Sequence, residues 1–487
     1  MFDSNQLKPI ESLIETWEAS GILRLYHDDC CQAEYRFGYA DRNRQRKTPE
    51  NPSYLLSARS GFLQGLAVMQ LVEAGLLELD APIGPWFPEY PPASHVTLRH
   101  MLFHESGIQD YYYGHLMLEL TADSSHQALD DKTRYVFESQ HFFSPRTWQE
   151  IVDFLSDTLL FEPGSQDEWS ATNHVMIETL IERVSGQSIQ AYLMERIFGP
   201  LGMKQTILGH QANTVSYVCM RDVHRLKAPY EGDSNIVFTT TVADLTKLMY
   251  GLRTRKLLSA ESWAEGVRPN VRGEAILCDY RNGFEFYHSY VLGYEADIYI
   301  DAPSQCSFFH IGNEAPIFRL VNGEWSHFMH QVRLVVEGIV TTPRQTHFDT
   351  YHERNAWDAM HLRMAKDQEE FVIDAKTSLC WALSEPEDKK PYVLMEGYRA
   401  IGLMILAINP KKKLYKIDIL IVDARYQNRG FGKIMLSKGL EILKAAGATK
   451  IDIIVNRFNT AAYQLYLALG FKETGIYEGG VRLSKPL

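Results

Sequence analysis

The strand-like run Ile417-Asp418-Ile419-Leu420-Ile421-Val422 leads through Asp423-Ala424-Arg425-Tyr426 into the loop Gln427-Asn428-Arg429-Gly430-Phe431-Gly432-Lys433. Beyond the loop, apolar residues recur at helical spacing, which predicts a helix with Ile434, Leu436, Leu440 and Leu443 on its apolar face. Glycines allow several backbone N–H groups to approach a diphosphate closely, and the positive end of the helix adds to the attraction. The sequence therefore predicts a strand, an anion-binding loop and a helix in series.

A second segment follows this loop and reads Asn459-Thr460-Ala461-Ala462-Tyr463-Gln464-Leu465-Tyr466-Leu467-Ala468-Leu469-Gly470-Phe471. The pairing of Gln-x-x-Gly-x-Gly with Asn-x-x-Ala-x-x-Leu-Tyr-x-x-x-Gly-Phe, in this order, resembles the GNAT superfamily of N-acetyltransferases. The resemblance implies an α/β GNAT fold, a mixed sheet with flanking helices, and acetyl-CoA as the co-substrate. It also implies that an amine attacks the thioester directly, while the site mainly holds the two reactants together.

The same resemblance implies a role for each matching position. The backbone around Leu420, Ile421 and Val422 would align the pantetheine arm and polarise the thioester carbonyl. The diphosphate would be held by Gln427, Asn428, Arg429, Gly430, Phe431, Gly432 and Lys433. Asn459 would contact the CoA arm, and Tyr466 would protonate the departing thiolate. The alternative for Tyr466 is a core aromatic residue on an amphipathic helix.

Four further sequence segments contribute to a closer resemblance within this superfamily. They are Gln368-Glu369-Glu370-Phe371-Val372, Ser378-Leu379, Ile401-Gly402 and Ile421-Val422-Asp423-Ala424-Arg425-Tyr426-Gln427. With these segments, residues 357–487 resemble the bacterial spermine/spermidine acetyltransferases, which implies a small primary amine such as a polyamine as the acceptor. An amine with a pKa of about 10 arrives protonated, so a base has to accept a proton. Asp418, Asp452 and Glu396 are candidates, but each is more often a solvated carboxylate, and the base stays open.

The N-terminal two thirds carry another set of motifs. They are Phe37-Gly38-Tyr39-Ala40-Asp41, Met69-Gln70-Leu71-Val72-Glu73-Ala74-Gly75, Leu98-Arg99-His100-Met101-Leu102-Phe103-His104-Glu105-Ser106-Gly107, Ile181-Glu182-Arg183-Val184-Ser185-Gly186 and Gly199-Pro200-Leu201-Gly202-Met203-Lys204. These motifs resemble the serine β-lactamase and penicillin-binding protein family. The resemblance implies an α/β fold with an antiparallel sheet flanked by helices, plus a helical subdomain.

The functional side chains of that family are largely missing. Activity requires a serine three residues before a lysine at the start of the long helix, so that the lysine helps to deprotonate the serine. Ala58 stands at the serine position and Gly61 at the lysine position. The Tyr-x-Asn motif is replaced by Trp169-Ser170-Ala171, so both Trp169 and Ala171 depart from the pattern. Only the third motif keeps its form, as His310-Ile311-Gly312 on a strand that is expected to edge the pocket.

These replacements predict a catalytically inactive hydrolase-like domain. Ser57 or Ser60 could replace the nucleophile only if a neighbouring base activated the hydroxyl. His310 is either a ligand-binding residue or a structural histidine on a strand. The domain would then bind a ligand in the cleft that holds the active site in the hydrolase family, hold the acetyltransferase in a homodimer, or support the fold.

The polar sequence that follows Val340 indicates a domain boundary. We expect a β-lactamase-like domain at residues 1–342, a linker at 343–355 and a GNAT domain at 356–487. Helical patterns cover Phe62–Leu77, Asn173–Ser185 and Ser326–Val340, and an antiparallel sheet is expected over Gly273–Leu320. In the last domain, strands are expected at Tyr392–Leu406, Tyr415–Val422 and Lys450–Val455, and helices at Gly432–Gly447 and Thr460–Leu469.

Bulk properties restrict the class of protein. A chain of 487 residues exceeds a single core, and its net charge of -12 disfavours a nucleic-acid surface. The chain does not open like a secretory signal, no apolar run is long enough to span a bilayer, and the six cysteines lack zinc-ligand spacing. We expect a cytoplasmic protein without a metal ion, whose partners are acetyl-CoA and a small amine. The alternatives are a sensor of β-lactam or peptidoglycan-type ligands and an acetyltransferase that inactivates amine-bearing antibiotics.

Overall fold

The computed structural model describes residues 4–112, 122, 125, 128–130, 133–134, 136–137, 146–220, 224–228, 236–270, 274–281, 284–302, 304–315, 318–321, 324–339, 346–365, 368, 371–396, 399–477 and 480–487. The chain divides into two compact units. Unit 1 comprises residues 1–269, 274–279 and 284–341, and unit 2 comprises residues 270–273, 280–283 and 342–487. Residues 343–345 of the expected linker and the pair Glu369-Glu370 lie outside the described residues.

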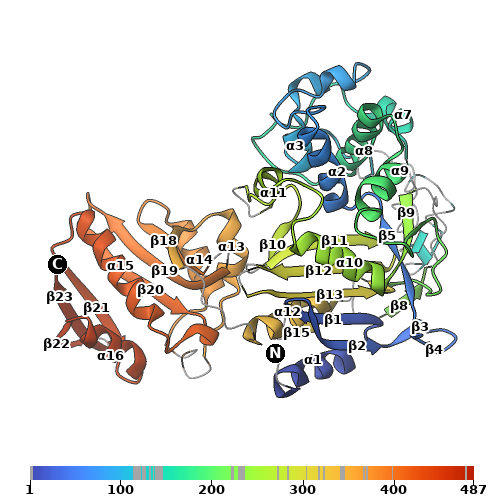
Figure 1. The fold of residues 1–487 in the computed structure, drawn as a ribbon. Helices are drawn as coiled ribbons and strands as arrows, with labels where there is room; N and C mark the ends of the chain where they lie inside the picture. The colour runs from blue at the N-terminus through green and yellow to red at the C-terminus, as the bar shows by residue number, and fades with distance from the viewer. Residues whose placement is uncertain are drawn as a thin grey trace. The chain divides into compact units, whose positions relative to one another are not determined.

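An antiparallel sheet forms the centre of unit 1 (Figure 1). Hydrogen bonds join its strands in the order β10 (Asp279–Arg281), β11 (Phe284–Val291), β12 (Tyr294–Asp301), β13 (Cys306–Gly312), β1 (Gly21–His27) and β2 (Cys30–Phe37). The register aligns His288 with Asp297 and Asp297 with His310. Because directly opposite residues share a face, these three side chains form a row across the sheet. Tyr287 and Ser289 face the other side, since side chains alternate along a strand.

Helices cover both faces of this sheet. The helices α1 (Ser4–Trp17) and α12 (Phe328–Ile339) share one apolar core with Leu23 and Phe308 of the sheet. On the other face, α2 (Gly61–Glu73) brings the ring of Phe62 edge-on to Tyr287, with 5.7 Å between ring centres. The helical subdomain around α2 contains α3 (Leu98–Leu102), α7 (Trp148–Ile151), α8 (Ala171–Ser185) and α9 (Ile189–Leu193).

Shorter elements complete unit 1. The helices α10 (Val242–Arg253) and α11 (Ala260–Gly266) follow the subdomain along the chain. The remaining strands are β3 (Tyr39–Asp41), β4 (Arg46–Lys47), β5 (Ser53–Ser57), β6 (Ile207–Leu208), β7 (Tyr217–Met220), β8 (His224–Lys227), β9 (Val237–Thr241), β14 (Glu314–Ala315), β15 (Phe318–Val321) and β16 (Glu324–His327). Strand β5 pairs with β9 and ends at Ser57, and three residues lie between Ser57 and the first residue of α2.

Unit 2 contains a sheet that is buried on both faces. The strands β17 (Thr346–Thr350), β18 (Lys389–Glu396), β19 (Arg399–Asn409) and β20 (Leu414–Val422) pair in that order. Leu403 and Ile405 of β19 join a core with α13 (Glu353–Met360) and α14 (Ala375–Ser384). Met404 and Leu406 point the other way, into a core with α15 (Phe431–Ala445). Burial on both faces explains why these strands read as continuous apolar runs.

A second, smaller sheet completes unit 2. Its strands pair in the order β21 (Lys450–Asn456), β23 (Gly480–Pro486) and β22 (Lys472–Tyr477), and α16 (Thr460–Ala468) connects β21 to β22. Close packing of α15 on the first sheet requires Gly439, where a Cβ atom would lie 2.7 Å from the sulfur of Met404. This close approach packs the middle of α15 against β19.

The structure differs from the sequence-based expectations at two places in unit 2. The expected single strand Tyr392–Leu406 is a hairpin, because Glu396 pairs with Arg399 and the chain reverses there. Apolar runs on both sides of the reversal hide it in the sequence. The expected linker 343–355 contains β17, whose polar side chains suit a strand that pairs on one side only, with β18. None of the helices in the described part of the chain combines the length and apolar character needed to cross a bilayer.

Candidate functional site

The loop between β20 and α15 has the backbone of an anion-binding turn. Asn428 (φ 60°) and Gly430 (φ 86°) both take the left-handed conformation. Gly430 caps α15 without a side chain that could occupy the first amides of the helix, and Lys433 is exposed on the first turn. Within the described residues, no hydrogen bond uses the amides of Gly430, Phe431 or Gly432. These three N–H groups can therefore donate to an anionic ligand.

Asp423 fastens the end of β20 to the start of this loop. Its carboxylate accepts hydrogen bonds from the backbone N and the Nε of Arg425 at 3.0 and 2.8 Å, and from the backbone N of Arg363 at 2.9 Å. Burial alone would raise the pKa of Asp423, but these hydrogen bonds and the charge of Arg425 hold it below its ordinary value. Asp423 is a positioning residue that the motif comparison did not single out. In the sequence, the feature that could have indicated this role is a single carboxylate directly after an apolar strand.

Gln427 closes the loop with its side chain. Its Nε2 donates to the carbonyl oxygen of Val422 at 2.9 Å and to the Oε1 of Gln368 at 2.9 Å. Arg429 is exposed, and its guanidinium lies 5.3 Å from the ring centre of Tyr426. The side chain of Gln427 therefore supports the turn, while Arg429 places a positive charge at its surface.

The strands β20 and β21 lie next to each other, but no hydrogen-bond ladder joins them in the described structure. Among the described strands, β20 pairs only with β19, through pairs such as Leu420 with Met404. Its other edge can offer backbone N–H and C=O groups to an extended ligand. A Cβ atom on Gly432 would lie 3.3 Å from Leu465 and 3.9 Å from Val422. The loop, the end of β20 and the helix α16 therefore meet at one point.

Tyr466 lies on α16 and presents a hydroxyl group that stays protonated. Burial raises the pKa of Tyr466 to about 12. Its ring packs against Phe471, with 5.6 Å between ring centres, and its hydroxyl makes no hydrogen bond among the described residues. Asn459 caps the same helix by accepting from the backbone N of Ala462 at 3.1 Å, which leaves its Nδ2 able to donate.

The three carboxylates that were considered as a base have structural surroundings. Asp418 accepts a hydrogen bond from the Nζ of Lys389. Asp452 accepts from Ser484 and pairs with Lys450 at 3.0 Å. Glu396 is buried at the end of β18. Asp418 and Asp452 therefore form hydrogen bonds or ion pairs with neighbouring side chains. None of the three carboxylates is identified as the general base by its contacts.

Unit 1 contains a cavity of about 330 Å³ at the start of α2. It is lined by Ser57, Arg59, Ser60, Gly61, Tyr111, Trp169, Ala171, His174, Ile236, His288 and Tyr290. Gly61, Trp169 and Ala171, which were expected at positions of the hydrolase motifs, are therefore brought together. Ala58 is fully buried directly before α2.

Ser60 is held by groups that cannot act as a base. Its Oγ lies 2.7 Å from the Oγ of Ser289 and 2.8 Å from the carbonyl oxygen of Ser57. The backbone N of Ser57 donates to the same Ser289 hydroxyl at 3.0 Å. The described hydrogen bonds of Ser60 thus involve only a hydroxyl and a carbonyl group. Ser289 was not expected from the sequence, because His288-Ser289-Tyr290 lies in the middle of an unmarked strand.

His174 occupies the space beside Gly61. A Cβ atom on Gly61 would lie 4.0 Å from the ring of His174, and the Nδ1 of His174 lies 2.8 Å from the Oε1 of Gln64. Burial lowers the pKa of His174 to about 3, and the charges of His104 and Arg59 add to this effect. The ring is therefore neutral at pH 7, and a long side chain at position 61 would meet it.

The structure corrects the expected position of His310. Its strand β13 lies two strands away from β11, whose residues His288 and Tyr290 line the cavity. The ring of His310 is 1% exposed and stacks on Phe37 at 6.0 Å between ring centres. His310 is therefore a core residue. The short motif His310-Ile311-Gly312 alone does not indicate whether its strand lies at the position of β11 or of β13 in the sheet.

Comparisons with known families agree with this division of the chain. Residues 16–321 match the family model described as Beta-lactamase, and residues 356–471 match the model of the Acetyltransferase (GNAT) family. Two known folds are thus present in succession, a β-lactamase-type domain with a helical subdomain and a C-terminal GNAT domain.

Individual relatives resemble only part of the chain. Penicillin-binding protein 4* of Bacillus subtilis is 28% identical over 216 residues, which are 42% of each chain. Esterase EstB of Burkholderia gladioli is 31% identical over 173 residues, 34% of this chain and 41% of that protein. The chain therefore spans about two fifths of the length of these relatives.

Solved structures support the fold of unit 1. A penicillin-binding protein from Bacillus halodurans matches with a TM-score of 0.53 at 19% identity, covering 67% of this chain and 99% of its own. The D-amino acid amidase from Ochrobactrum anthropi SV3 matches with a TM-score of 0.52 at 20% identity, covering 69% of this chain and 98% of its own. At these identities the likeness shows a shared fold alone.

Proposed function

Because this chain belongs to the beta-lactamase family and also carries a GNAT acetyltransferase domain, we propose that it is an acetyl-CoA-dependent N-acetyltransferase with a non-catalytic hydrolase-type domain. The observation that carries the proposal is the meeting of the loop, the free edge of β20 and α16 around Gly432. The loop amides fit a diphosphate, and the edge of β20 fits an extended amide-containing arm.

The residues of unit 2 would act by binding, positioning and proton donation. The amides of Gly430, Phe431 and Gly432 would hold the diphosphate, with Arg429 and Lys433 adding positive charge at the loop. The backbone between Leu420 and Val422 would align the thioester so that the amine attacks its carbonyl carbon. The Tyr466 hydroxyl would then give its proton to the departing thiolate as the C–S bond breaks, and the proton released by the attacking amine would restore the hydroxyl.

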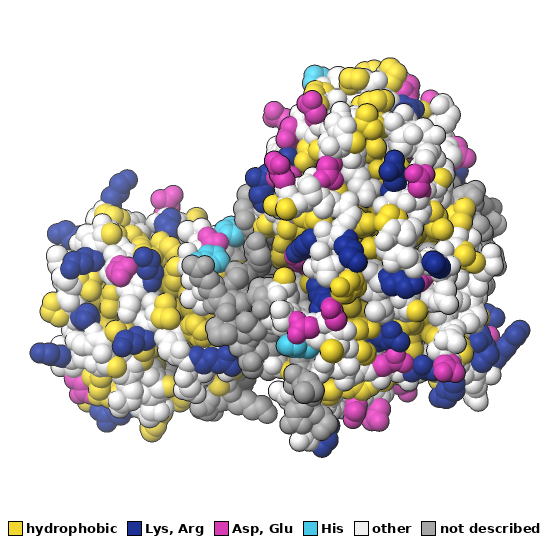
Figure 2. Space-filling view, in the orientation of Figure 1, with side chains coloured by type: hydrophobic (Ala, Val, Ile, Leu, Met, Phe, Trp, Pro, Cys, Tyr) yellow, Lys and Arg dark blue, Asp and Glu magenta, His cyan; other side chains and the backbone are white. Residues whose placement is uncertain are grey.

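We propose that the acceptor is a small primary amine, and polyamines are the first class to test. The polyamine assignment rests on sequence resemblance alone. Residues 356–487 contain 20 Lys and Arg against 15 Asp and Glu, and Figure 2 shows Lys and Arg side chains spread over the visible face of unit 2. This excess of positive charge favours the anionic co-substrate, so a polycationic acceptor would need a local acidic subsite.

The hydrolase-type domain is proposed to be inactive because its cavity lacks an activated nucleophile. Ala58 and Gly61 replace the serine and the lysine, and among the described residues the hydroxyl of Ser60 is hydrogen-bonded only to Ser289 and Ser57. The ring of His174 further lies beside position 61, 4.0 Å from a Cβ atom placed there. The domain would then serve ligand binding or assembly.

Release of free CoA thiol tests the acetyltransferase proposal directly. Purified full-length protein is incubated with acetyl-CoA and a panel of polyamines, amino sugars, aminoglycosides and amino acids. We expect thiol release above the rate of spontaneous hydrolysis for at least one amine, and mass spectrometry should find that amine acetylated. Absence of acceptor-dependent release across the panel would contradict the proposal, provided that calorimetry detects binding of CoA.

The cavity favours a second candidate function, a sensor of β-lactam or peptidoglycan-type ligands. Its volume of about 330 Å³ and its lining by Tyr111, Trp169 and Tyr290 suit a small ligand with an apolar part. Reversible binding of a penicillin-type probe without covalent attachment would favour the sensor. Covalent attachment would instead show that the cavity still contains an active nucleophile.

A further inference from the structure

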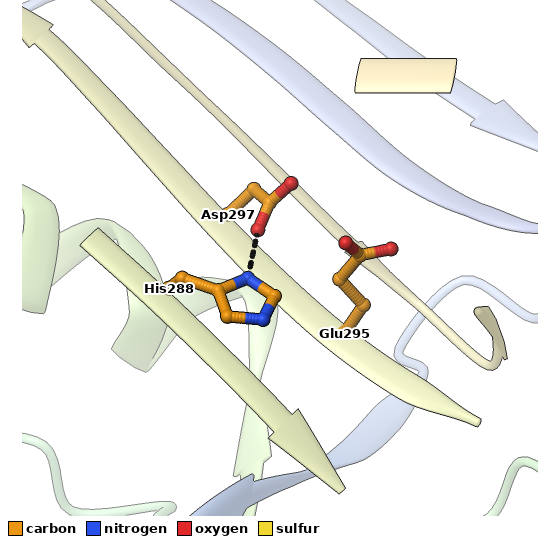
Figure 3. Close-up of side chains that lie close together, drawn as sticks. All are labelled: His288, Glu295 and Asp297. Carbon is orange, nitrogen blue, oxygen red and sulfur yellow. Dashed lines mark hydrogen bonds and ion pairs between the residues drawn. The ribbon is translucent and has the colours of Figure 1, made fainter. Parts of the chain in front are cut away.

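Two groups of hydrogen-bonded polar side chains differ in what they leave to a ligand. In unit 1, His288, Glu295 and Asp297 lie together on the neighbouring strands β11 and β12 (Figure 3). The Nδ1 of His288 lies 2.6 Å from the Oδ1 of Asp297. The Nε2 of His327 likewise lies 3.1 Å from the Oε1 of Glu295, so each carboxylate has an imidazole partner and requires no ligand. In unit 2, a pair of glutamines instead reaches a backbone carbonyl at the free edge of β20.

The register of β19 and β20 determines which backbone groups face this free edge. The amide of Asp423 donates to the carbonyl oxygen of Ile401 at 3.0 Å, and these two residues flank the pair of Gly402 with Val422. Such a pair is of the non-hydrogen-bonded kind, so the N–H and C=O of Val422 point away from β19. The same holds two residues earlier, at Leu420, because the two kinds of pair alternate. An extended ligand can therefore pair with these outward groups near the end of β20.

One of the outward groups is already occupied. The Nε2 of Gln427 donates to the carbonyl oxygen of Val422 and to the Oε1 of Gln368, at 2.9 Å in both cases. A carbonyl oxygen can only accept, so the amide nitrogen of Gln427 has to face Val422, and its second hydrogen is left for the oxygen of Gln368. The orientation of both amide groups therefore follows from the position of the Val422 carbonyl.

Gln368 is itself held in place by the chain around it. Its backbone N donates to the carbonyl oxygen of Ala365 at 2.8 Å, and its carbonyl oxygen accepts from the backbone N of Phe371 at 3.0 Å. Earlier in the same segment, the carbonyl oxygen of Arg363 accepts from the backbone N of Ala424 at 2.8 Å. The segment between α13 and α14 is thus attached at two points to the chain that joins β20 to α15.

We propose that Gln368 is a positioning residue for the co-substrate, because it keeps the Gln427 amide on the carbonyl oxygen of Val422. This inference rests on the proposed acetyltransferase function. With that oxygen occupied, an amide N–H of the pantetheine arm has the carbonyl of Leu420 as its acceptor at this end of β20. Because outward groups recur at every second residue, pairing with Val422 instead would displace the arm by about 7 Å. The occupied carbonyl therefore selects the register in which the arm binds.

A freed Val422 carbonyl would permit a second, non-productive register. In this register the thioester would lie away from its productive place and from the Tyr466 hydroxyl. Such binding adds affinity without reaction, so kcat and KM for acetyl-CoA would fall by the same factor while kcat/KM stays constant. If the glutamines only supported the turn, their loss would instead lower kcat/KM, because the loop would bind the co-substrate less well.

Steady-state kinetics with full-length protein and an accepted amine test the proposal. Gln368→Leu keeps the approximate size of the side chain but removes the acceptor for Gln427, and kcat and KM for acetyl-CoA should both fall about fivefold. Gln368→Glu keeps an acceptor oxygen and should keep kcat within about twofold of wild type. Gln427→Leu should lower kcat at least as much as Gln368→Leu, and the double variant should lower it no further, because Gln368 acts through Gln427.

The control is Gln464→Leu, at an exposed glutamine of α16, which should leave both constants unchanged. Thermal melts establish that the variants are folded, and Gln427→Leu tests the same contact if Gln368→Leu is not. Equal kinetics of Gln368→Leu and wild type, or a fall in kcat/KM, would overturn the positioning role and leave the acetyltransferase function standing. No transfer by wild type to any amine would overturn the proposed function, and this inference with it.

Discussion

The hydroxyl oxygens of Ser60 and Ser289 lie 2.7 Å apart and connect the N-terminal cap of α2 to β11. The Ser289 hydroxyl also accepts a hydrogen bond from the backbone N of Ser57. The serine nearest to the expected nucleophile position is therefore built into a structural network. Because neither partner of Ser60 is a base, its hydroxyl keeps the low reactivity of an ordinary alcohol.

We predict that a fluorescent penicillin does not acylate the protein. Wild type, Ser57→Ala and Ser60→Ala should all show background labelling after denaturing electrophoresis. Ser60→Ala should lower stability by about 1 kcal/mol, because a buried hydroxyl of Ser289 loses a partner. Labelling of wild type that disappears in Ser60→Ala would show that Ser60 is a nucleophile.

Tyr466→Phe should lower kcat for acetyl transfer about 100-fold or more, because the departing thiolate loses its proton donor. The KM for acetyl-CoA should change little, since the ring keeps its contact with Phe471. With the pKa of Tyr466 at about 12, the wild-type rate should show no loss of this acid between pH 7 and pH 10. Initial rates over this pH range measure both effects.

The matched control is Tyr463→Phe, on the same helix, whose hydroxyl donates to the exposed Glu473. It should leave kcat within about twofold of wild type. An equal loss in both variants would mean that the tyrosines support α16 and that Tyr466 has no acid role.

Gly430→Ala should weaken CoA binding about tenfold. Nothing lies within 4 Å of the added Cβ, but the left-handed backbone at φ 86° strains any other residue and would rotate the free amides of the loop. Gly447→Ala, at φ 104° beyond the other end of α15, introduces similar strain away from the loop. Calorimetry should therefore find weaker binding only for Gly430→Ala, and equal losses would argue against the loop as the diphosphate site.

Asp423→Asn should destabilise unit 2 by about 2–4 kcal/mol, because Arg425 and the Arg363 amide lose their charged acceptor. The folded-state pKa of Asp423 lies below its unfolded value. Its stabilisation is therefore complete above the unfolded pKa of about 3.9 and is lost as the pH falls through the lower folded pKa. Chemical unfolding at pH 7 and pH 3 should show a smaller difference between variant and wild type at pH 3. Asp452→Asn, at a less buried carboxylate, is the control.

His174 should make unit 1 sensitive to mild acid. Its folded-state pKa of about 3 lies below the unfolded value of about 6.5, so the unfolded chain binds the proton first as the pH falls. The resulting loss of stability begins below pH 6.5 and reaches up to about 2 kcal/mol at pH 5. His174→Gln should remove this part of the pH dependence, whereas His95→Gln, at an exposed histidine, should retain it. Thermal melts at pH 7.5 and pH 5 measure the difference.

The sequence predicted the parts of the fold that repeat a strong local pattern. The helix of α15 and the strand β20 follow from apolar spacing, and their boundaries agree within one or two residues with those in the structure. The hairpin at Glu396 and the strand β17 were missed, because an apolar run does not mark its own reversal and a polar run resembles a linker. Both are determined by pairing with strands elsewhere in the chain.

A sequence motif can indicate a candidate site only where it concentrates the residues in one stretch, and the role of such a stretch stays a prediction. The turn Gln427–Lys433 is such a stretch. Ser289, His174 and the row from His288 to His310 come from separate elements, and only the register of β11, β12 and β13 brings that row together. His310 was placed at the wrong strand of the sheet for this reason, since its three-residue motif contains no information about strand order.

The missing ladder between β20 and β21 has a consequence for the protein before it meets any ligand. Each strand presents a line of backbone donors and acceptors that a strand from another molecule could satisfy. The ligand-free protein should therefore be prone to self-association through these edges, especially at high concentration. Acetyl-CoA, by covering the edge of β20, would then protect the protein against aggregation as well as supply the acetyl group.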